Sequence, residues 1–313
     1  MRKIVIGTRQ SALALTQSGQ VAELLRGAAR EAGTEAEFEL KKIMTKGDRI
    51  LDVSLSKVGG KGLFVKEIEH ALLKGEIDLA VHSMKDMPAE LPGGLTIGGV
   101  PRREDPRDCL ITRDGGGFKT LAAGARVGTS SLRRACQLKA ARPDLTVEVL
   151  RGNIDSRLRR LDTGEMDAVI LAAAGLHRMG WGDRVSEYLE PELCLPAVGQ
   201  GALAVECRSG DPFILELLAA VTHEETRRAV AAERSFLHTL QGGCQVPIGA
   251  YATCLPGGRL SLTGLVGEPD GSILLKDTAE GSDPEALGQS LAQSLIRRGA
   301  DGILAKVRSE AHE

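Results

Sequence analysis

Cationic and hydroxyl side chains follow the short apolar runs that recur along the first two thirds of the chain. In open parallel sheets ligands bind beyond the carboxyl ends of the strands, and guanidinium groups bind carboxylates or phosphates through paired hydrogen bonds. One arginine alone is more often a solvated surface residue, so the recurrence after five runs is what predicts an anion-binding cleft. The side chains concerned are Arg9, Ser11, Ser83, Lys85, Thr129, Ser131, Arg133, Arg134, Arg151, Arg157 and Arg178.

The expected anion is an organic polycarboxylate rather than a nucleotide. The chain has no G-x-x-x-x-G-K-[ST] loop and no acidic cluster placed to hold Mg²⁺ for phosphoryl transfer. The glycine-rich stretch Gly59–Gly62 lacks that spacing, and we interpret it as part of a lid that carries Lys61 and Phe64.

Asp86 is a carboxylate among these cations, which would hold it ionised. One interpretation is a structural partner for Lys85 or for a neighbouring arginine. The other is an acid/base group that also stabilises positive charge developing at the centre of an anionic substrate. The residue types and their spacing leave both interpretations open.

Cys244 differs from the other cysteines because it follows the pair Gly242–Gly243 past the end of a long helix near Leu240. The negative end of the helix dipole would raise the pKa of its thiol, and His238 is not placed as a base. We therefore predict a sulfur that traps one reactive electrophile as a stable thioether. The remaining cysteines lie in apolar or helical contexts typical of small buried hydrophobes: Cys109, Cys136, Cys194, Cys207 and Cys254.

The elements that must position these residues alternate between short β-branched runs and amphipathic stretches. Strands are predicted over residues 3–7, 37–43, 78–82, 95–100, 126–129, 146–150, 167–172 and 202–207. Helices are predicted over residues 11–30, 63–74, 131–141, 154–161, 212–221 and 224–240. Such a βαβα alternation predicts mostly parallel sheets covered by helices.

The alternation occurs in two copies, because residues 6–13 and 127–134 share a strand, a glycine, a threonine and a serine that opens an arginine-bearing helix. We predict an α/β fold: two doubly wound, parallel-type domains of similar topology around a cleft, like periplasmic binding proteins, plus a smaller α+β C-terminal domain. Strands over residues 248–254, 259–266 and 272–276 before a helix over 284–298 indicate the last domain. The predicted domains are residues 1–101 with 202–219, residues 107–195 and residues 223–313, joined by crossings at 101–106 and 195–201.

The composition is that of an ordinary globular protein with aliphatic cores. Of 313 residues, 42% are apolar and 3% aromatic, and 40 basic against 42 acidic side chains leave a net charge of −2. We expect no nucleic acid and no membrane as partner, because no overall field recruits either and no run has the roughly 18 apolar residues of a spanning helix. The scattered cysteines and the lack of an apolar segment behind Met1–Lys3 predict a cytoplasmic location, without a disulfide framework or a metal site.

Seven motifs run in order along the chain. They are Gly7–Leu15, Val58–Phe64, Val81–Pro88, Gly128–Arg134, Leu150–Asn153, Leu195–Gly201 and Gly242–Pro247. Each alone is modest, and together they closely resemble the porphobilinogen deaminase (hydroxymethylbilane synthase) family. The resemblance implies a three-domain transferase of tetrapyrrole and haem biosynthesis. Its substrate porphobilinogen, an aminomethylpyrrole with acetate and propionate arms, is joined head to tail in fours, with release of ammonia and finally hydroxymethylbilane.

The resemblance also implies roles for individual residues. Cys244 matches the attachment point of a dipyrromethane cofactor, two linked pyrroles made from the substrate, and Asp86 matches the catalytic group that contacts pyrrole N–H groups and assists deamination. Further cofactor-binding positions are matched by Ser83, Lys85, Thr129, Ser131, Arg133, Arg134 and Arg157. Substrate-binding positions are matched by Arg9, Ser11, Gln17, Arg151, Arg157, Arg178 and Gln200, and lid positions by Lys61 and Phe64. A monomer is expected.

One departure from the family pattern lies before Arg157, where Asp155-Ser156 replaces an expected threonine and adds a negative charge. The main alternative function is a two-lobed binding protein for a small polycarboxylate, and a Cys/His acyl-transferring enzyme is a further one. A group bound covalently to Cys244 would distinguish the deaminase from the binding protein.

Overall fold

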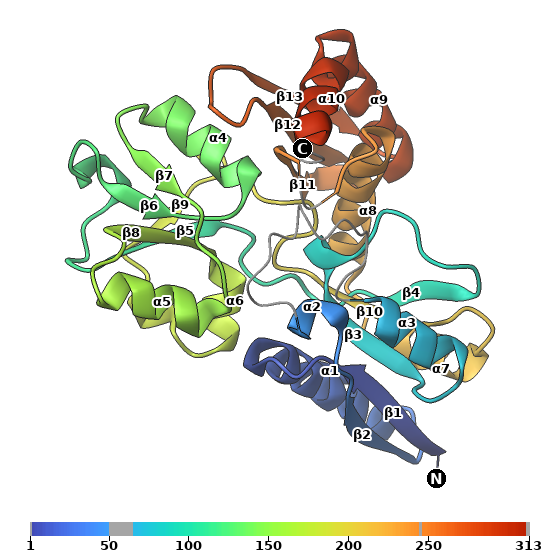
Figure 1. Cartoon of the computed structure of the whole chain (residues 1–313). Coiled ribbons are helices and arrows are strands. Elements are labelled where there is room, and N and C mark those ends of the chain that lie inside the picture. The colour runs from blue at the N-terminus through green and yellow to red at the C-terminus, as the bar shows by residue number, and fades with distance from the viewer. Residues whose placement is uncertain (1, 50–64, 244–245, 311–313) are drawn as a thin grey trace. The chain divides into compact units, whose positions relative to one another are not determined.

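The computed structural model describes residues 2–49, 65–243 and 246–310 (Figure 1). The chain divides into two compact units, of which the first comprises residues 1–104 and 202–227 and the second residues 105–201 and 228–313.

The first unit is built on a five-stranded sheet in the order β2-β1-β3-β10-β4. β1 pairs in parallel with β2 and β3, whereas β10 is antiparallel to β3 and β4. β10 follows the return crossing, which confirms the prediction that the chain rejoins this sheet there. The strands are β1 Arg2–Thr8, β2 Ala36–Lys42, β3 Leu79–Ser83, β4 Leu95–Gly99 and β10 Leu203–Arg208.

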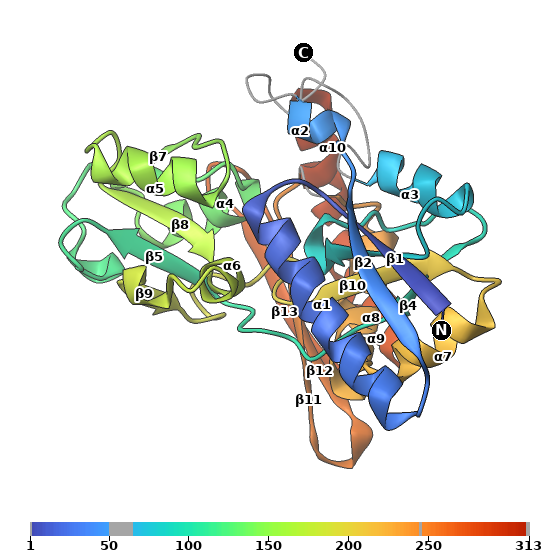
Figure 2. The ribbon, with the colours of Figure 1, turned by 90° about the horizontal axis from the view of Figure 1, so that it is seen from below.

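Helices cover both faces of this sheet. Leu25 of α1 and Leu218 of α7 pack with Ile4 in a core on one face, and Figure 2 shows α1 lying along β1 and β2. Ile68 and Leu72 of α3 pack on the other face. The helices are α1 Ala12–Glu31, α2 Lys46–Arg49, α3 Lys66–Leu73 and α7 Pro212–Ala220, with a 3₁₀ turn η1 at Met84–Asp86. The predicted start of α3 near residue 63 lies outside the described residues.

The second unit contains a sheet of the same topology, in the order β7-β6-β8-β5-β9. β6 pairs in parallel with β7 and β8, and β5 is antiparallel to β8 and β9. The antiparallel strand β5 again follows a crossing, so the prediction of one architecture used twice is confirmed. The strands are β5 Asp108–Thr112, β6 Arg126–Gly128, β7 Thr146–Glu148, β8 Ala168–Ala172 and β9 Glu187–Leu189.

Both faces of this second sheet are buried. Leu110 and Ile170 pack under Leu138 of α4, while Ile111 and Leu171 pack on the opposite face. In Figure 1 α4 lies on one side of the sheet and α5 and α6 lie on the other. The helices are α4 Leu132–Ala141, α5 Ile154–Asp162 and α6 Ala173–Arg178.

Three elements of this sheet region are absent from the predictions: β5, β9 and α6. β5 begins with Asp108 and directly follows a proline-bounded charged segment, so its five residues are easily taken for a continuation of the crossing. β9 has three residues and α6 has six, which are too few for a period to be recognised.

The smaller C-terminal part of the second unit is an antiparallel sheet in the order β11-β12-β13. Phe236 of α8, Leu291 of α9 and Leu304 of α10 pack against one face of it, and Cys136 of α4 packs against Leu265 on the other. The elements are α8 Glu224–Thr239, β11 Ile248–Cys254, β12 Leu260–Gly267, β13 Leu274–Gly281, α9 Pro284–Arg297 and α10 Ala300–Glu310. The predicted α+β region is confirmed, although α10 was not expected and β13 extends beyond residue 276.

Candidate active site

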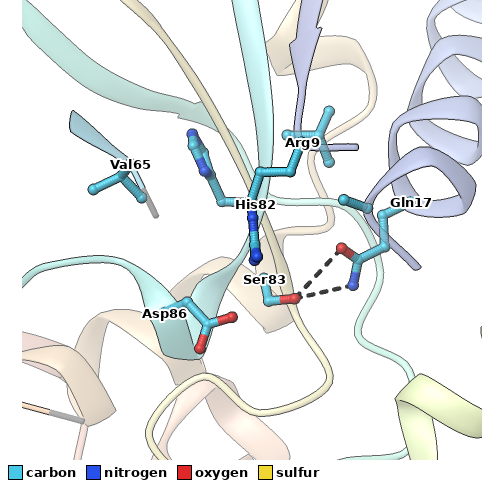
Figure 3. A pocket seen from close by; sticks show the side chains of 8 residues that line it. Arg9, Gln17, Val65, His82, Ser83 and Asp86 are labelled. Carbon is cyan, nitrogen blue, oxygen red and sulfur yellow. Dashed lines mark hydrogen bonds between the residues drawn. The ribbon is translucent and has the colours of Figure 1, made fainter. Parts of the chain in front are cut away.

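In the first unit a hollow of about 30 Å³ opens at the carboxyl ends of β1 and β3. Asp86 of η1 and Ser83 of β3 both line it, as do Arg9 after β1 and Gln17 on α1 (Figure 3). The hollow thus brings together four predicted site residues that are far apart in the sequence. Its full lining is Arg9, Ala14, Gln17, Val65, Val81, His82, Ser83 and Asp86.

Gln17 and Ser83 are hydrogen-bonded to each other across the hollow. Gln17 Nε2 lies 3.0 Å from Ser83 Oγ, and the dashed lines in Figure 3 mark this contact. Gln17 is buried although it lies on a helix, because it faces β3 rather than solvent. These contacts direct the Ser83 hydroxyl toward the Gln17 amide.

Asp86 is exposed at the rim of the hollow. Within the described part of the chain no side chain pairs with its carboxylate, so the structural-partner interpretation gains no support from Lys85 or from an arginine. Lys85 precedes it in η1 and is half-buried. A carboxylate at such a rim is available to a ligand.

Arg9 is held by Asp48, which is absent from the predicted site residues. Arg9 Nε and Nη2 lie 3.1 and 2.5 Å from Asp48 Oδ1, and Thr45 Oγ1 donates to Asp48 Oδ2 at 2.8 Å. Burial would raise the pKa of Asp48, but the hydrogen bonds from Arg9 and Thr45 outweigh it and leave the pKa lowered. The pair fixes the direction of the Arg9 guanidinium at the wall of the hollow.

Ser11 and Ser131 are the N-caps of α1 and α4. Ser11 Oγ accepts from the backbone N–H of Ala14 at 3.3 Å, and Ser131 Oγ accepts from that of Arg134 at 3.4 Å. Thr129 Oγ1 in turn accepts from the Ser131 N–H at 3.2 Å. The serines that the duplicated motif predicts at the start of two helices are confirmed as hydroxyl caps. Each capped N-terminus, that of α1 after Arg9 and that of α4 after Thr129, presents oriented N–H groups.

In the second unit Asp108 lies at the centre of a buried cluster. Its Oδ2 accepts a hydrogen bond from Arg133 Nη1 at 2.6 Å, and its Oδ1 accepts from Arg134 Nε and from Gln200 Nε2, each at 2.9 Å. Burial would raise the pKa of Asp108, but the two guanidinium groups outweigh it and hold the pKa well below its usual range. Asp108 is absent from the predicted site residues. The signal available in the sequence is an ionisable residue that opens the apolar run of β5.

Backbone carbonyls complete the coordination of these arginines. Arg133 Nη1 also donates to Leu195 O at 2.7 Å, and Arg134 Nη1 donates to Ile170 O at 2.9 Å. Gln200 Nε2 donates to Pro106 O at 2.7 Å, which joins the two crossing segments. The predicted residues Arg133, Arg134 and Gln200 are therefore parts of one buried network.

This network keeps a surplus of positive charge, because two guanidinium groups share one carboxylate. Arg157 adds another: its Nε donates to Gly152 O at 2.9 Å, and burial together with repulsion from Arg134 lowers the pKa of Arg157 to about 10. No carboxylate among the described residues pairs with Arg157. A buried surplus of guanidinium groups suits the carboxylate arms of a polycarboxylate ligand.

The departure at Asp155-Ser156 has a local structural explanation. Asn153 caps α5 by accepting from the Ser156 N–H at 2.9 Å, and Ser156 Oγ donates back to Asn153 O at 3.0 Å. Asp155 is exposed in the first turn of α5, where the helix dipole favours a negative charge. Asp155 forms no ion pair with Arg157, although both are among the described residues.

The remaining predicted residues of the second unit are Arg151 and Arg178. Arg151 is half-buried in the segment between β7 and α5. Arg178, at the end of α6, donates from Nη2 to Gly201 O at 2.8 Å. Gly201 belongs to the return crossing, so Arg178 contacts the same crossing segment as Gln200.

Cys244, Lys61 and Phe64 lie outside the described residues, but the chain on either side of Cys244 is described. A Cβ on Gly242 would lie 2.5 Å from Leu237 Cδ1 and 2.6 Å from Ile248 Cδ1, so the backbone packs closely there and has no room for a side chain. The residue just before this glycine pair, Gln241, adopts a left-handed backbone conformation with φ of 50°.

Backbone carbonyls at the end of α8 also have hydrogen-bond partners that the sequence does not suggest. Arg308 of α10 donates from Nη2 to Leu240 O at 3.0 Å and to Gln241 O at 2.9 Å. The positive charge of Arg308 offsets the negative end of the α8 dipole. The expectation of a raised pKa for the Cys244 thiol rests on that negative end.

β11, which begins four residues after Cys244, is attached beside Arg133. The Ala250 N–H donates to Pro196 O at 3.1 Å, and a Cβ on Gly249 would lie 3.3 Å from Arg133 Cδ. The strand that follows the cysteine segment is therefore fixed next to the buried cationic network.

Comparison with known proteins identifies the family. Residues 4–216 match the model of the "Porphobilinogen deaminase, dipyromethane cofactor binding domain", and residues 227–297 match that of the "Porphobilinogen deaminase, C-terminal domain". The chain is 60% identical over 305 residues to the porphobilinogen deaminase of Bacillus thuringiensis subsp. konkukian (strain 97-27), covering 97% of each chain. It is 58% identical over 311 residues to that of Bacillus cereus (strain B4264), covering 99% of each.

Solved structures include a periplasmic solute-binding protein from Desulfovibrio salexigens, with a TM-score of 0.44 and 10% identity over 72% of this chain and 73% of that chain. The match of both family models, in order and across most of the chain, agrees with the seven motifs. The chain belongs to the porphobilinogen deaminase family.

Proposed function

We propose that this chain carries out the reaction of its family through the residues described above. It is a transferase that deaminates porphobilinogen, joins four molecules of it head to tail on a dipyrromethane primer, and releases hydroxymethylbilane and ammonia. Membership of this family favours the enzyme over the alternative of a two-lobed polycarboxylate-binding protein.

The observation that carries the assignment of residues is the surplus positive charge around Asp108. Arg133 and Arg134 share one carboxylate and Arg157 adds a further charge near Arg134, which leaves guanidinium groups for the acetate and propionate arms of the dipyrromethane. When bound, the dipyrromethane supplies the pyrrole end to which substrate units are added. We assign its arms to this network together with Ser83, Lys85, Thr129 and Ser131.

We assign the sulfur of Cys244 to the covalent attachment of the dipyrromethane. The support is the motif Gly242–Pro247 and the position of β11, which begins four residues after Cys244 and lies beside Arg133. A permanent thioether requires no neighbouring base, because the sulfur reacts once and not in each turnover.

We assign acid/base work to Asp86. Its carboxylate lies at the rim of the hollow without a partner among the described residues, where it can accept a hydrogen bond from pyrrole N–H groups and stabilise positive charge on the substrate. The residues that we assign to substrate carboxylates and their orientation are Arg9, Ser11, Gln17, Arg151, Arg157, Arg178 and Gln200.

We further propose a monomer of three domains that works in the cytoplasm without nucleic acid or membrane partners. Cys109, Cys136, Cys194 and Cys207 form no disulfide, which suits a reducing compartment. None of the helices in the described ranges combines the length and apolar character needed to cross a bilayer.

A turnover assay tests the function directly. Purified chain incubated with porphobilinogen is expected to release four equivalents of ammonia for each hydroxymethylbilane formed. Tight binding of porphobilinogen without ammonia release would instead identify a binding protein.

A further inference from the structure

Behind the hollow of the first unit lies a buried group of three ionisable side chains that the assignments above do not use. His82 of β3, Glu206 of β10 and Glu69 of α3 are 6%, 0% and 6% exposed. His82 Nε2 lies 3.1 Å from Glu206 Oε2. Because β3 and β10 are paired in the sheet, the imidazole and the Glu206 carboxylate link two neighbouring strands beneath α3.

Both carboxyl groups of this set are incompletely satisfied. Glu206 Oε1 and Glu69 Oε1 are buried and have no hydrogen-bond partner among the described residues. A buried carboxylate oxygen without a partner is costly when the group is ionised. Burial and the charge of Glu206 raise the pKa of Glu69, against smaller opposing effects of His82 and Lys66. The set is therefore suited to hold a proton.

Of these three residues, His82 is the one that lines the hollow with Asp86 and Ser83. The charged side chains around it are Glu206 from β10, which is hydrogen-bonded to it, Glu69 from α3, which interacts with it electrostatically, and Arg9 and Asp86, which line the same hollow. His82 thus contacts a buried carboxyl group through its imidazole and lines the hollow of the proposed chemistry.

The reaction requires such a group. In each addition one carbon–carbon bond forms, the bond between the methylene carbon and the amine nitrogen of porphobilinogen breaks, and one pyrrole carbon loses its proton. The amine leaves as ammonia, so the proton from carbon must be held until ammonia or solvent takes it up. Four additions repeat this cycle, and a carboxylate such as Asp86 must be deprotonated again before each one.

We propose that His82, held by Glu206, is the positioning residue that takes this proton from Asp86 and returns it to the hollow as ammonia leaves. The imidazole accepts the proton on one nitrogen while Glu206 holds the other, and Glu69 shares the charge of the pair. The proposal rests on the function proposed above and deepens the assignment of Asp86.

The simplest test is His82→Gln in the cofactor-loaded enzyme, because an amide can still donate to Glu206 but cannot carry a proton. We expect kcat to fall roughly 100-fold with little change in KM. We also expect the acid limb of the pH–kcat profile, where protonation of the imidazole blocks transfer, to disappear. His70→Gln on the exposed side of α3 is the matched control and should behave like the wild type.

A second variant, Glu206→Gln, leaves His82 in place and keeps an acceptor for its N–H. The imidazolium then loses its carboxylate partner, so the acid limb should move to lower pH. If His82→Gln does not fold, the position of the acid limb in Glu206→Gln tests the proposal.

A purely structural link between β3 and β10 predicts a different outcome. Both variants would then lower the unfolding midpoint while the position of the acid limb stayed as in the wild type, and that result would overturn the proposal. Failure of the proposed function is distinguishable, since the wild-type chain itself would then release no ammonia.

Discussion

Arg133 and Asp108 form a buried ion pair in which Nη1 lies 2.6 Å from Oδ2, with the side chains 4% and 0% exposed. Arg134 shares the same carboxylate at 2.7 Å, and Gln200 binds it from the return crossing. Asp108 therefore orients two of the predicted cofactor-binding arginines and links them to both crossing segments. The carboxylate is a positioning element for the cationic network.

Replacing Asp108 with asparagine should destabilise the protein strongly. Two buried guanidinium groups would lose their charge partner, for which a cost of roughly 3–5 kcal/mol is expected. Urea unfolding of the Asp108→Asn variant measures it. Asp144→Asn, which breaks the exposed pair of Arg142 and Asp144, is the control and should leave the midpoint nearly unchanged. Equal midpoints for the two variants would contradict the role given to Asp108.

The contribution of Asp108 should depend on pH in a defined direction. Its pKa is lowered in the folded state relative to about 3.9 in the unfolded chain. Its stabilising contribution is therefore complete above the unfolded value and declines as the pH falls below roughly 4 toward the folded value. The difference in unfolding free energy between wild type and Asp108→Asn should narrow over that range. A difference that widens on acidification would refute this linkage.

Gly249→Ala should weaken the attachment of β11 to the cationic network. The new Cβ would lie 3.1 Å from both Leu195 O and Pro196 O and 3.3 Å from Arg133 Cδ. Overpacking of this kind costs about 1–3 kcal/mol, and the displaced arginine should lower the fraction of chains that carry the cofactor. Thermal unfolding measures the loss of stability, and intact-mass measurement gives the fraction of chains that carry the cofactor.

The matched control for that substitution is Gly27→Ala in α1, where a Cβ meets nothing within 4 Å. Alanine in a helix interior should stabilise the chain by up to about 1 kcal/mol and leave loading unchanged. If Gly249→Ala behaved like Gly27→Ala, β11 would not be packed as tightly as described.

Asp86→Asn should fold and carry the cofactor normally yet lose most turnover. Loss of an acid/base group of this kind typically lowers kcat by roughly 10²- to 10⁴-fold. Steady-state assays with porphobilinogen give the rate, and intact mass gives the loading. Glu90→Gln, an exposed neighbouring carboxylate outside the hollow, should retain the wild-type rate. Near-normal turnover of Asp86→Asn would eliminate the role assigned to it.

The duplication of the large α/β sheets was accessible from the sequence because its local signals are repeated. The segments 6–13 and 127–134 carry the same local signals, and each opens a helix capped by serine. The antiparallel strand of the second sheet was not accessible, because β5 combines an initial aspartate with a short apolar run after a crossing. Its identity as a strand depends on pairing with β8 and β9, which are distant in the sequence.

Some predicted site residues could be found because they follow a strand or cap a helix, as Arg9 and Ser131 do, and others, such as Gln17 and Gln200, only because they match positions of the family. The counterions of the arginines could not be identified from the sequence. Asp48 and Asp108 become partners of Arg9 and Arg133 only through the fold, at separations of 39 and 25 residues. The carboxyl groups behind His82 likewise come from α3 and β10, so no local pattern marks them.

The central claim is that a group made from the substrate is bound to Cys244, and intact-mass spectrometry of the purified protein tests it most directly. We expect the wild type to exceed its sequence mass by two pyrrole units, or to gain them on incubation with porphobilinogen, whereas Cys244→Ser should never do so. A wild-type chain of bare sequence mass that porphobilinogen cannot load, or an undiminished increment in Cys244→Ser, would contradict it.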